Sequence, residues 1–244
     1  MTKQTSAYFV TGTDTDVGKT VATAWLASEL ALHSRTAVVK PLQTGTTTPD
    51  VDGDEAFYRQ HLNSTVTLKT IRSLPEPLAP SIAAQRIGES IELAPVVEQC
   101  ETIIRDHDVT LVEGAGGLLV TINEREDMAA LALALKAPLV VAIRPALGTL
   151  NHTMLTIEAA QRRGLKVDLL VCSGFPDDAG VVELENLRFL RDVFPSLPLV
   201  VLRMGDLIRG GLKELQPRIL GPKPRLLTNC DIPMFHFDSR HMKR

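Results

Sequence analysis

The sequence is poor in aromatic residues and in excess charge of either sign, and each shortage excludes a class of protein. Aromatic residues make up only 4% of the 244 positions, which argues against a platform that stacks the bases of single-stranded nucleic acid. The net charge is −3, with acids and bases interspersed, so the basic stripe of a duplex-binding surface is missing. We therefore expect no nucleic-acid partner.

Cysteines and long apolar runs are also scarce. Cys100, Cys172 and Cys230 are widely separated, a pattern that fits neither a disulfide framework nor a zinc site. Their number and spacing are more typical of small buried side chains in a reducing compartment. The amino-terminal residues are polar, and the longest apolar region, 128–143, is interrupted by Lys136. We expect a cytoplasmic protein with no membrane partner.

Short β-branched runs alternate with helical patterns along the whole chain. Several runs are apolar on consecutive residues, as is typical of strands covered on both faces. The alternation predicts an α/β fold, with a mostly parallel sheet flanked by helices on both faces, in a single domain over 1–244. The predicted strands are 8–10, 37–40, 110–113, 139–143, 169–172 and 199–202. The predicted helices are 20–32, 54–62, 93–106, 127–135, 151–163, 182–193 and 206–215.

The most informative segment runs from Phe9 to Thr20 and places a Gly/Thr/Asp loop between an apolar run and a helical pattern. A nucleoside-triphosphate phosphate loop requires this order, because backbone N–H groups and the helix N-terminus bind phosphate oxygens. Lys19 would place a positive charge at the outer phosphates, and the Thr20 hydroxyl would bind Mg²⁺. The strict motif has a glycine where this chain has Thr13, and the nearest glycine is Gly12. The loop is thus a variant, and an ordinary helix start is the alternative.

Two further candidates follow the second predicted strand. Lys40 ends an apolar run, so we expect it at the carboxyl ends of the strands, beside the phosphate loop. A fixed cation there would stabilise a phosphoryl group during its transfer. The alternative is a strand-end lysine that reaches to water. The loop 49–55 clusters acids that suit a hard cation. These acids equally suit a solvated loop before an acidic helix start, with Asp54 as the N-cap residue.

Two later segments have a similar place in the predicted sheet. In 110–117 a buried-type strand ends in Glu113, which can reach a metal at the phosphate loop, and small residues follow that allow close approach of a substrate. A tight turn after a glutamate is the alternative. Residues 148–151 open a helix whose free N–H groups suit a carboxylate, although capping by Thr149 or Asn151 explains them equally well. His152 has no apparent partner, and we expect no catalytic role for it.

Together these segments resemble the dethiobiotin synthetase family, which carries the same displaced first glycine. The matching segments are 11–20, 40–45, 112–117 and 147–152, and the likeness covers residues 7–175. Beyond that the likeness fades, and the segment 197–221 does not match the family's final strand and nucleotide-contacting loop. The tail 231–244 is polar and basic-ended, a composition typical of a disordered end.

The resemblance implies an ATP- and Mg²⁺-dependent ligase that closes a cyclic urea on 7,8-diaminononanoate. In the family, an amine takes up CO₂ (from bicarbonate) as a carbamate, which attacks the γ-phosphate to form a carbamic–phosphoric anhydride. The second amine then closes the ring and displaces phosphate. By this resemblance Lys19 and Lys40 are catalytic, and Thr20, Asp54 and Glu113 hold magnesium. The family is a homodimer with the substrate at the subunit interface.

The resemblance also implies two sets of binding residues. The nucleotide-binding residues are Thr13, Asp14, Thr15, Asp16, Val17, Gly18, Lys19, Thr20, Val21, Ser173 and Gly174. The substrate-binding residues are Thr44, Glu113, Gly114, Ala115, Gly116, Gly117, Gly148, Thr149, Leu150 and Asn151. Of these, residues 148–151 would bind the substrate's carboxylate from the opposite subunit.

One departure and two other classes bear on this interpretation. Ser173 stands in the segment where many members carry an asparagine that holds the purine, which leaves the base preference open. A corrinoid-type amidoligase usually appends a glutamine-amidotransferase domain, for which this chain has neither room nor a catalytic cysteine. A partitioning or positioning ATPase usually carries another lysine early in the phosphate loop. Only Thr, Asp and Val stand between Gly12 and Gly18 here.

Overall fold

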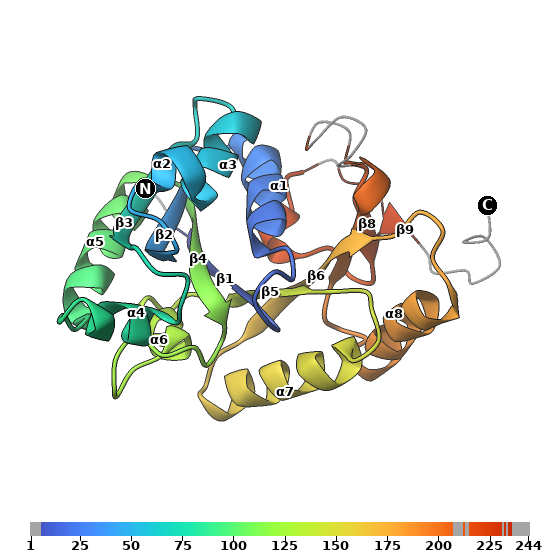
Figure 1. Cartoon of the computed structure of the whole chain (residues 1–244). Coiled ribbons are helices and arrows are strands. Elements are labelled where there is room, and N and C mark those ends of the chain that lie inside the picture. Colours follow the sequence, from blue (N-terminus) through green and yellow to red (C-terminus); the bar gives the residue numbers. More distant parts are fainter. Residues whose placement is uncertain (1–5, 207–211, 213–214, 231, 233, 236–244) are drawn as a thin grey trace.

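The computed structural model describes residues 6–206, 212, 215–230, 232 and 234–235, and within them nine strands form one sheet (Figure 1). The strands are β1 (Ser6–Gly12), β2 (Thr36–Thr44), β3 (Thr67–Leu74), β4 (Val109–Gly117), β5 (Leu139–Ile143), β6 (Val167–Phe175), β7 (Leu199–Arg203), β8 (Arg218–Leu220) and β9 (Met234–Phe235). Their order is β3-β2-β4-β1-β5-β6-β7-β8-β9. All neighbours pair in parallel except β7 and β8, which are antiparallel.

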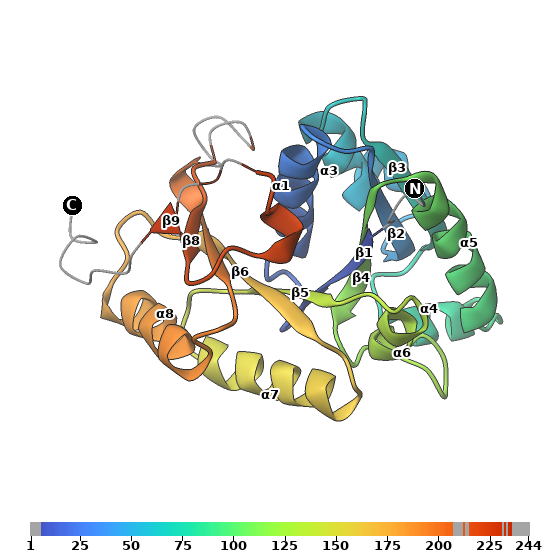
Figure 2. The ribbon, with the colours of Figure 1, turned by 180° about the vertical axis from the view of Figure 1, so that it is seen from behind.

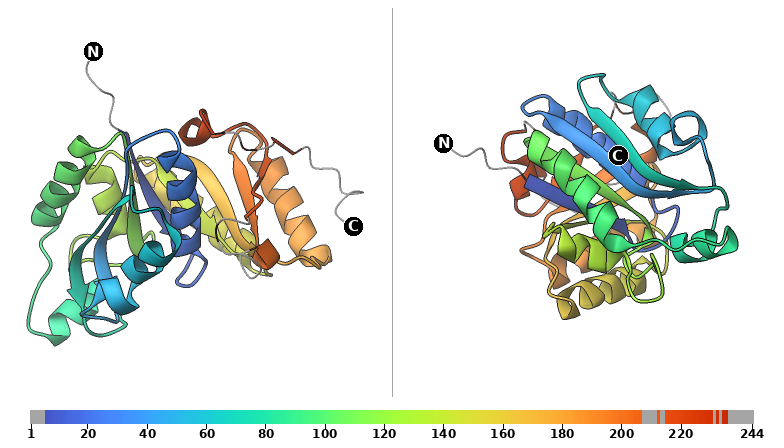
Figure 3. Two further views of the ribbon diagram at one scale, coloured as in Figure 1. Left: turned by 90° about the horizontal axis from the view of Figure 1, so that it is seen from above. Right: turned by 90° about the vertical axis from the view of Figure 1, so that its left-hand side faces the viewer.

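Helices cover both faces of the twisted sheet, and Figures 1 and 2 show α1 on one side and α7 and α8 on the other. The helices are α1 (Lys19–Ala31), α2 (Pro49–Asp52), α3 (Asp54–His61), α4 (Pro80–Arg86), α5 (Leu93–Asp106), α6 (Met128–Ala134), α7 (Thr149–Arg162) and α8 (Val181–Val193). α1 and α3 contribute to one apolar cluster and α4 to α8 to the other, so the sheet is the middle layer (Figure 3). None of the described helices is long and apolar enough to cross a membrane.

The apolar strands of the centre reflect this double coverage. Successive strand residues point to opposite faces, so in β1 Phe9 packs on the side of α4 to α8 and Val10 on the side of α1. In β5 all five side chains are buried. Such consecutive burial is the physical reason for the apolar runs, and it confirms the α/β fold predicted from them.

The strand order places the phosphate loop at the centre of the sheet. β1 lies between β4 and β5, and the chain leaves β1 through α1 towards β2 on one side before it returns to β5 on the other. In an open α/β sheet, ligands bind outside the carboxyl ends of the strands at such a reversal of direction. The loop that the sequence marks as phosphate-binding follows β1 at this point.

The six predicted strands all lie within strands of the sheet, but only 139–143 has the predicted bounds, and the other five strands are longer than predicted. β2 continues past Lys40 to Thr44, and β4 continues past Glu113 to Gly117, so neither charged residue ends its strand. β3, an edge strand, was not predicted, because its apolar residues Leu68, Ile71 and Leu74 are separated by pairs of polar residues and form neither an apolar run nor an alternating pattern. The predicted helix 206–215 and the tail 231–244 lie largely outside the described residues.

The three cysteines are buried, as the sequence predicts. Cys172 lies in β6 and Cys100 in α5, both inside the same apolar cluster. Burial raises the pKa of the Cys100 thiol to about 12, so it stays protonated at neutral pH. The position of these thiols fits their interpretation as small buried side chains.

Candidate active site

A cavity of about 850 Å³ opens at the carboxyl ends of β1, β2 and β4. It brings together residues from five separate parts of the chain, including both predicted catalytic lysines. The predicted site residues that line it are Thr15, Asp16, Gly18, Lys19, Thr20, Val21, Lys40, Thr44, Asp54, Glu113, Ala115 and Gly116. The sequence analysis missed Leu42, Gln43, Val120 and the segment 77–80, which line it as well.

The phosphate loop joins β1 to α1 through a left-handed glycine. Gly18 is the N-cap residue of α1, and its φ of 89° lies in the region that favours glycine. A Cβ built on Gly18 would lie 2.4 Å from Oγ of Ser173, so the end of β6 packs directly against the loop. The first N–H groups of α1 have no acceptor within the helix and are available to phosphate oxygens.

Lys19 is the first residue of α1, and its side chain is folded back over the loop. Its Nζ donates to the carbonyl oxygen of Asp14 at 2.9 Å, and only 7% of the residue is exposed. Burial lowers the pKa of Lys19, opposed by the nearby carboxylate of Glu113. The ammonium group therefore lies between the phosphate loop and the acidic side of the cavity.

Lys40, on β2, is buried between two carboxylates. Its Nζ lies 2.5 Å from Oδ2 of Asp54 and 2.9 Å from Oε1 of Glu113, and it also donates to the carbonyl oxygen of Gly114 at 3.2 Å. Burial alone lowers the pKa of Lys40, but the two carboxylates outweigh this effect and the pKa is raised. Burial conversely raises the pKa of Asp54, but Lys40 outweighs it and the pKa is lowered. The site therefore fixes a cation beside two anions.

Three oxygen-bearing side chains meet beside this lysine. The Thr20 hydroxyl, in the first turn of α1, lies 3.1 Å from Oδ1 of Asp54 and 3.2 Å from Oε1 of Glu113. Mg²⁺ prefers oxygen ligands and usually takes one or two carboxylates together with substrate phosphates, so this donor set fits it. Among the described residues there is no group of three or more His, Cys, Asp or Glu suited to a metal. The protein thus offers only part of an octahedral shell.

The start of α3 differs from the expected one. Gly53, not Asp54, is the N-cap residue, and Asp54 is the first residue of the helix. The N–H of Asp54 donates to Oε1 of Gln43 at 3.2 Å, which ties the start of α3 to the end of β2. Because its carboxylate does not cap the helix, Asp54 is directed to Thr20 and Lys40 instead.

Two buried hydroxyls next to Glu113 were not predicted. Thr23 of α1 donates to Oε2 of Glu113 at 2.5 Å, and the Tyr58 hydroxyl of α3 donates to the same oxygen. Thr23 follows Thr20 by three residues, and Tyr58 follows Asp54 by four. Residues at these spacings share a helix face, so the helical pattern would have placed both hydroxyls beside the predicted ligands.

The remaining predicted nucleotide residues surround the loop without lining the cavity. The N–H of Thr13 donates to the carbonyl oxygen of Ala142 in β5 at 3.0 Å, and Val17 is buried. Asp14 is ion-paired with Arg144 at 2.6 Å. Ser173 and Gly174 lie in β6, and the former contacts the loop at Gly18 as described above.

The remaining predicted substrate residues fall into two groups. Gly114 and Gly117 belong to β4, where Gly114 accepts from Lys40 and Gly117 pairs with Gly12 of β1. Residues 148–151 lie at the start of α7 and do not line the cavity of their own chain. Gly148 is the N-cap residue of α7 and no side chain caps this helix, so the capping alternative for Thr149 and Asn151 is wrong.

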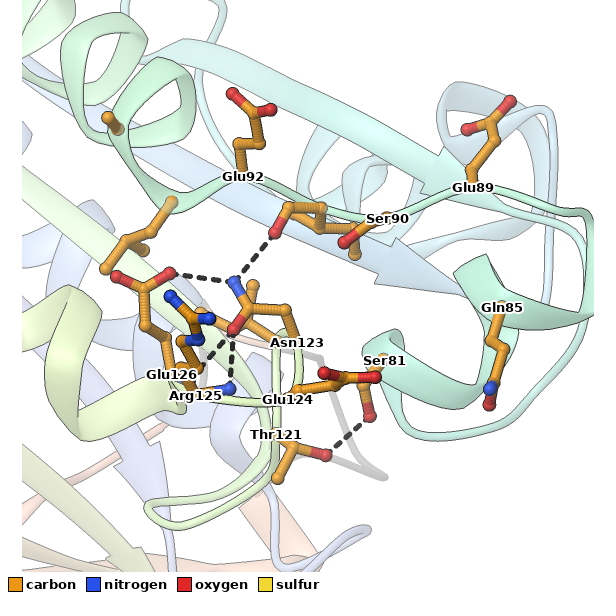
Figure 4. A pocket seen from close by; sticks show the side chains of 14 residues that line it. Ser81, Gln85, Glu89, Ser90, Glu92, Thr121, Asn123, Glu124, Arg125 and Glu126 are labelled. Atoms are coloured by element: carbon orange, nitrogen blue, oxygen red, sulfur yellow. Dashed lines mark hydrogen bonds between the residues drawn. The ribbon is translucent and has the colours of Figure 1, made fainter.

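A second cavity, of about 730 Å³, lies between α4, the start of α5 and the loop 121–126 (Figure 4). None of the predicted site residues lines it. Asn123 donates to the carbonyl oxygen of Ile91 at 2.8 Å and to Oε2 of Glu126 at 2.7 Å, and the hydroxyls of Ser81 and Thr121 are 2.5 Å apart. The bond from Asn123 to Ile91 joins the loop 121–126 to the segment before α5, and the bond between Ser81 and Thr121 joins this loop to α4.

Comparison with known proteins finds a family model and curated relatives that match most of the chain. A family model described as an AAA domain matches residues 6–203. A curated relative from Rhodococcus erythropolis, named ATP-dependent dethiobiotin synthetase BioD, is 45% identical over 201 residues, 80% of this chain and 86% of the relative. A relative of the same name from Mycolicibacterium vanbaalenii is 39% identical over 221 residues, 89% of this chain and 96% of the relative.

Solved structures share the fold at much lower identity. A plasmid partition protein from Borrelia burgdorferi bound to AMPPNP has a TM-score of 0.57 and 10% identity, covering 87% of this chain and 95% of that one. A ParA family ATPase from Chlorobium tepidum has a TM-score of 0.53 and 12% identity, covering 86% and 91%. At such identities the likeness extends to the fold alone.

Proposed function

Because the chain belongs to the ATP-dependent dethiobiotin synthetase family, we propose that it forms the ureido ring of dethiobiotin from 7,8-diaminononanoate and CO₂, with ATP and Mg²⁺. The observation that supports this proposal most strongly is the convergence of Lys19, Lys40 and Glu113 in one cavity beside the phosphate loop. The first is next to the loop backbone, and the other two form a buried ion pair. Phosphoryl transfer depends mainly on such positioned charges.

The ATP phosphates would lie along the loop, against the N–H groups at the start of α1. Lys19, whose Nζ lies against the loop at the carbonyl oxygen of Asp14, would contact the outer phosphates from there. Thr20, Asp54 and Glu113 would hold Mg²⁺, which supplies positive charge at the β- and γ-phosphates. The two carboxylates and the hydroxyl come from three different elements, so the site depends on the correct packing of α1 and α3 on β4.

The chemistry would proceed in three steps. One amine of the diamine adds CO₂ and loses a proton, and an oxygen of the resulting carbamate attacks the γ-phosphorus and displaces ADP. The other amine then attacks the carbamoyl carbon of the anhydride, expels phosphate and loses its proton as the ring closes. Lys40 would stabilise the carbamate and the transferring phosphoryl group, and Thr44 would help to hold the carbamate. Both line the same cavity.

The substrate's carboxylate would be bound by a second copy of the chain. Residues 148–151 start α7 with a left-handed N-cap glycine and no side-chain cap, a helix start that suits an anion, but they do not line their own chain's cavity. The loop between β5 and α7 is held in place, since Asn186 of α8 donates to the carbonyl oxygens of Pro145 and Ala146. A homodimer that places this helix start over the partner's cavity would complete the site.

Release of phosphate from ATP tests the proposal directly. We expect release only when 7,8-diaminononanoate, bicarbonate and Mg²⁺ are all present, with dethiobiotin detected by mass as the product. Each component is omitted in turn, and the diamine is also replaced by a monoamine of the same length. Phosphate release that does not depend on the diamine would contradict the proposed reaction.

The base of the nucleotide is expected to matter little. Ser173 is short, 7% exposed and packed against Gly18, so it offers the base less than an asparagine would. We expect kcat/KM for ATP, CTP and GTP to agree within about one order of magnitude, whereas a hydrogen-bonding base site discriminates by about 10⁴-fold. The measurement is the same phosphate-release assay at matched Mg²⁺. Strong selectivity for ATP would show that another residue holds the purine.

A further inference from the structure

Glu113 is completely buried, and its two carboxylate oxygens have different neighbours. Oε1 faces the cavity side, where it accepts from Lys40 and Thr20. Oε2 faces the opposite way and accepts from the hydroxyls of Thr23 and Tyr58. One oxygen of the carboxylate therefore faces the cavity, and the other is held by hydroxyl groups on the side away from the cavity.

The two hydroxyls that hold Oε2 come from helices that also supply the cavity side. α1 carries both Thr20 and Thr23, and α3 carries both Asp54 and Tyr58. In each helix the first residue of the pair faces the cavity and the second lies behind Glu113. Tyr58 is only 1% exposed. The hydrogen bond from its hydroxyl to Glu113 links α3 to β4.

A buried carboxylate is stable only when its oxygens have partners. If the hydroxyls of Thr23 and Tyr58 were absent, Oε2 would have no hydrogen-bond donor. The carboxylate could then rotate, and Oε1 would lose its contacts with Lys40 and Thr20. Side chains that hydrogen-bond to a metal-ligating residue usually fix the orientation of that residue. Their loss lowers metal affinity or activity by about 10–100-fold. The geometry of Glu113 fits this arrangement.

We propose that Tyr58 is a positioning residue, supported by Thr23, whose hydroxyl fixes Glu113 so that Oε1 stays directed at Thr20 and Lys40. Through α3 the same contact also fixes Asp54, the other carboxylate on Lys40. The inference rests on the proposed function for its kinetic readout. Its consequence for Mg²⁺-dependent nucleotide binding can be measured without the reaction.

The first test is Tyr58→Phe, which keeps the buried ring and removes the hydroxyl. We expect kcat at saturating ATP and Mg²⁺ to fall about 10-fold, in the range seen for side chains that hydrogen-bond to a metal ligand. Tyr8→Phe is the matched control, because it removes the chain's other phenol, which lines a separate pocket with residues 225–230. Thr23→Val should act like Tyr58→Phe, and Thr23→Ser should restore most of the activity.

The second test is a double-mutant cycle with Glu113→Gln, read by calorimetry with a non-hydrolysable ATP analogue, with and without Mg²⁺. Tyr58→Phe should reduce the gain in affinity that Mg²⁺ gives to the otherwise unaltered protein. It should add nothing in the Glu113→Gln background, because it acts through that residue. Equal effects in both backgrounds, or no effect in either, would overturn the inference.

The two proposals fail in different ways. If the proposed function is wrong, the unaltered protein itself shows no diamine-dependent phosphate release, while the calorimetric cycle still reports on Tyr58. If the positioning role is wrong, the unaltered protein is active and Tyr58→Phe matches it in both measurements. Should Tyr58→Phe fold poorly, as judged by its thermal unfolding midpoint, the pair Thr23→Val and Thr23→Ser decides the question.

Discussion

Replacing Lys40 with alanine is expected to lower kcat for ring closure by about 10³-fold, while the nucleotide stays bound. Lys40 is the buried cation between Asp54 and Glu113, and its Nζ also donates to the carbonyl oxygen of Gly114 in β4. Its loss would remove the charge that we propose to stabilise the transferring group, but would leave Lys19 and the start of α1 in place. The measurement combines phosphate release with calorimetric binding of an ATP analogue.

Two further variants separate charge from position. Lys69→Ala removes an exposed lysine from the neighbouring strand β3 and should leave kcat unchanged. Lys40→Arg keeps the charge in a larger, planar group, and we expect only a small part of the activity to return because the pocket between the carboxylates is tight. Full activity of Lys40→Ala would remove this lysine from the mechanism.

The predicted site depends more on the order of the strands than on their ends. Lys40 and Glu113 were expected near the phosphate loop because each follows an apolar run in a parallel sheet, and they do line the same cavity. Their strands nevertheless run four residues further, to Thr44 and Gly117. The extension of β2 comes from pairing with β3, whose sequence lacks the apolar run typical of a strand in a parallel sheet.

Contacts between distant elements could not be predicted from local patterns. Helical spacing places Tyr58 on the same face as Asp54, but only the packing of α3 on β4 brings its hydroxyl to Glu113. The segment 77–80 lines the cavity because it follows β3, which the sequence did not reveal. For residues 148–151 the sequence left a carboxylate site and helix capping open, and the second copy of the chain comes from the family resemblance alone; these residues do not line their own chain's cavity.

Replacing Glu113 with glutamine is expected to raise the Mg²⁺ concentration needed for half-maximal activity by about 10–100-fold. Glutamine keeps the shape of the side chain but has no negative charge, and its amide nitrogen has to face either Lys40 or the hydroxyls of Thr23 and Tyr58. In one orientation a donor opposes the ammonium group, and in the other the hydroxyls lose their acceptor. Either arrangement weakens the oxygen site that Glu113 shares with Thr20 and Asp54.

Glu55→Gln is the matched control for this variant. Glu55 is buried like Glu113 and follows Asp54 directly in sequence, but its carboxylate accepts from the N–H of Thr70 and from Arg59, outside the cavity. Its replacement should leave the Mg²⁺ titration unchanged, so a shift confined to Glu113→Gln reports on the oxygen site and not on the loss of a buried charge. An identical titration for both variants and the unaltered protein would count against ligation by Glu113 and would leave Asp54 and Thr20 as the ligands to test.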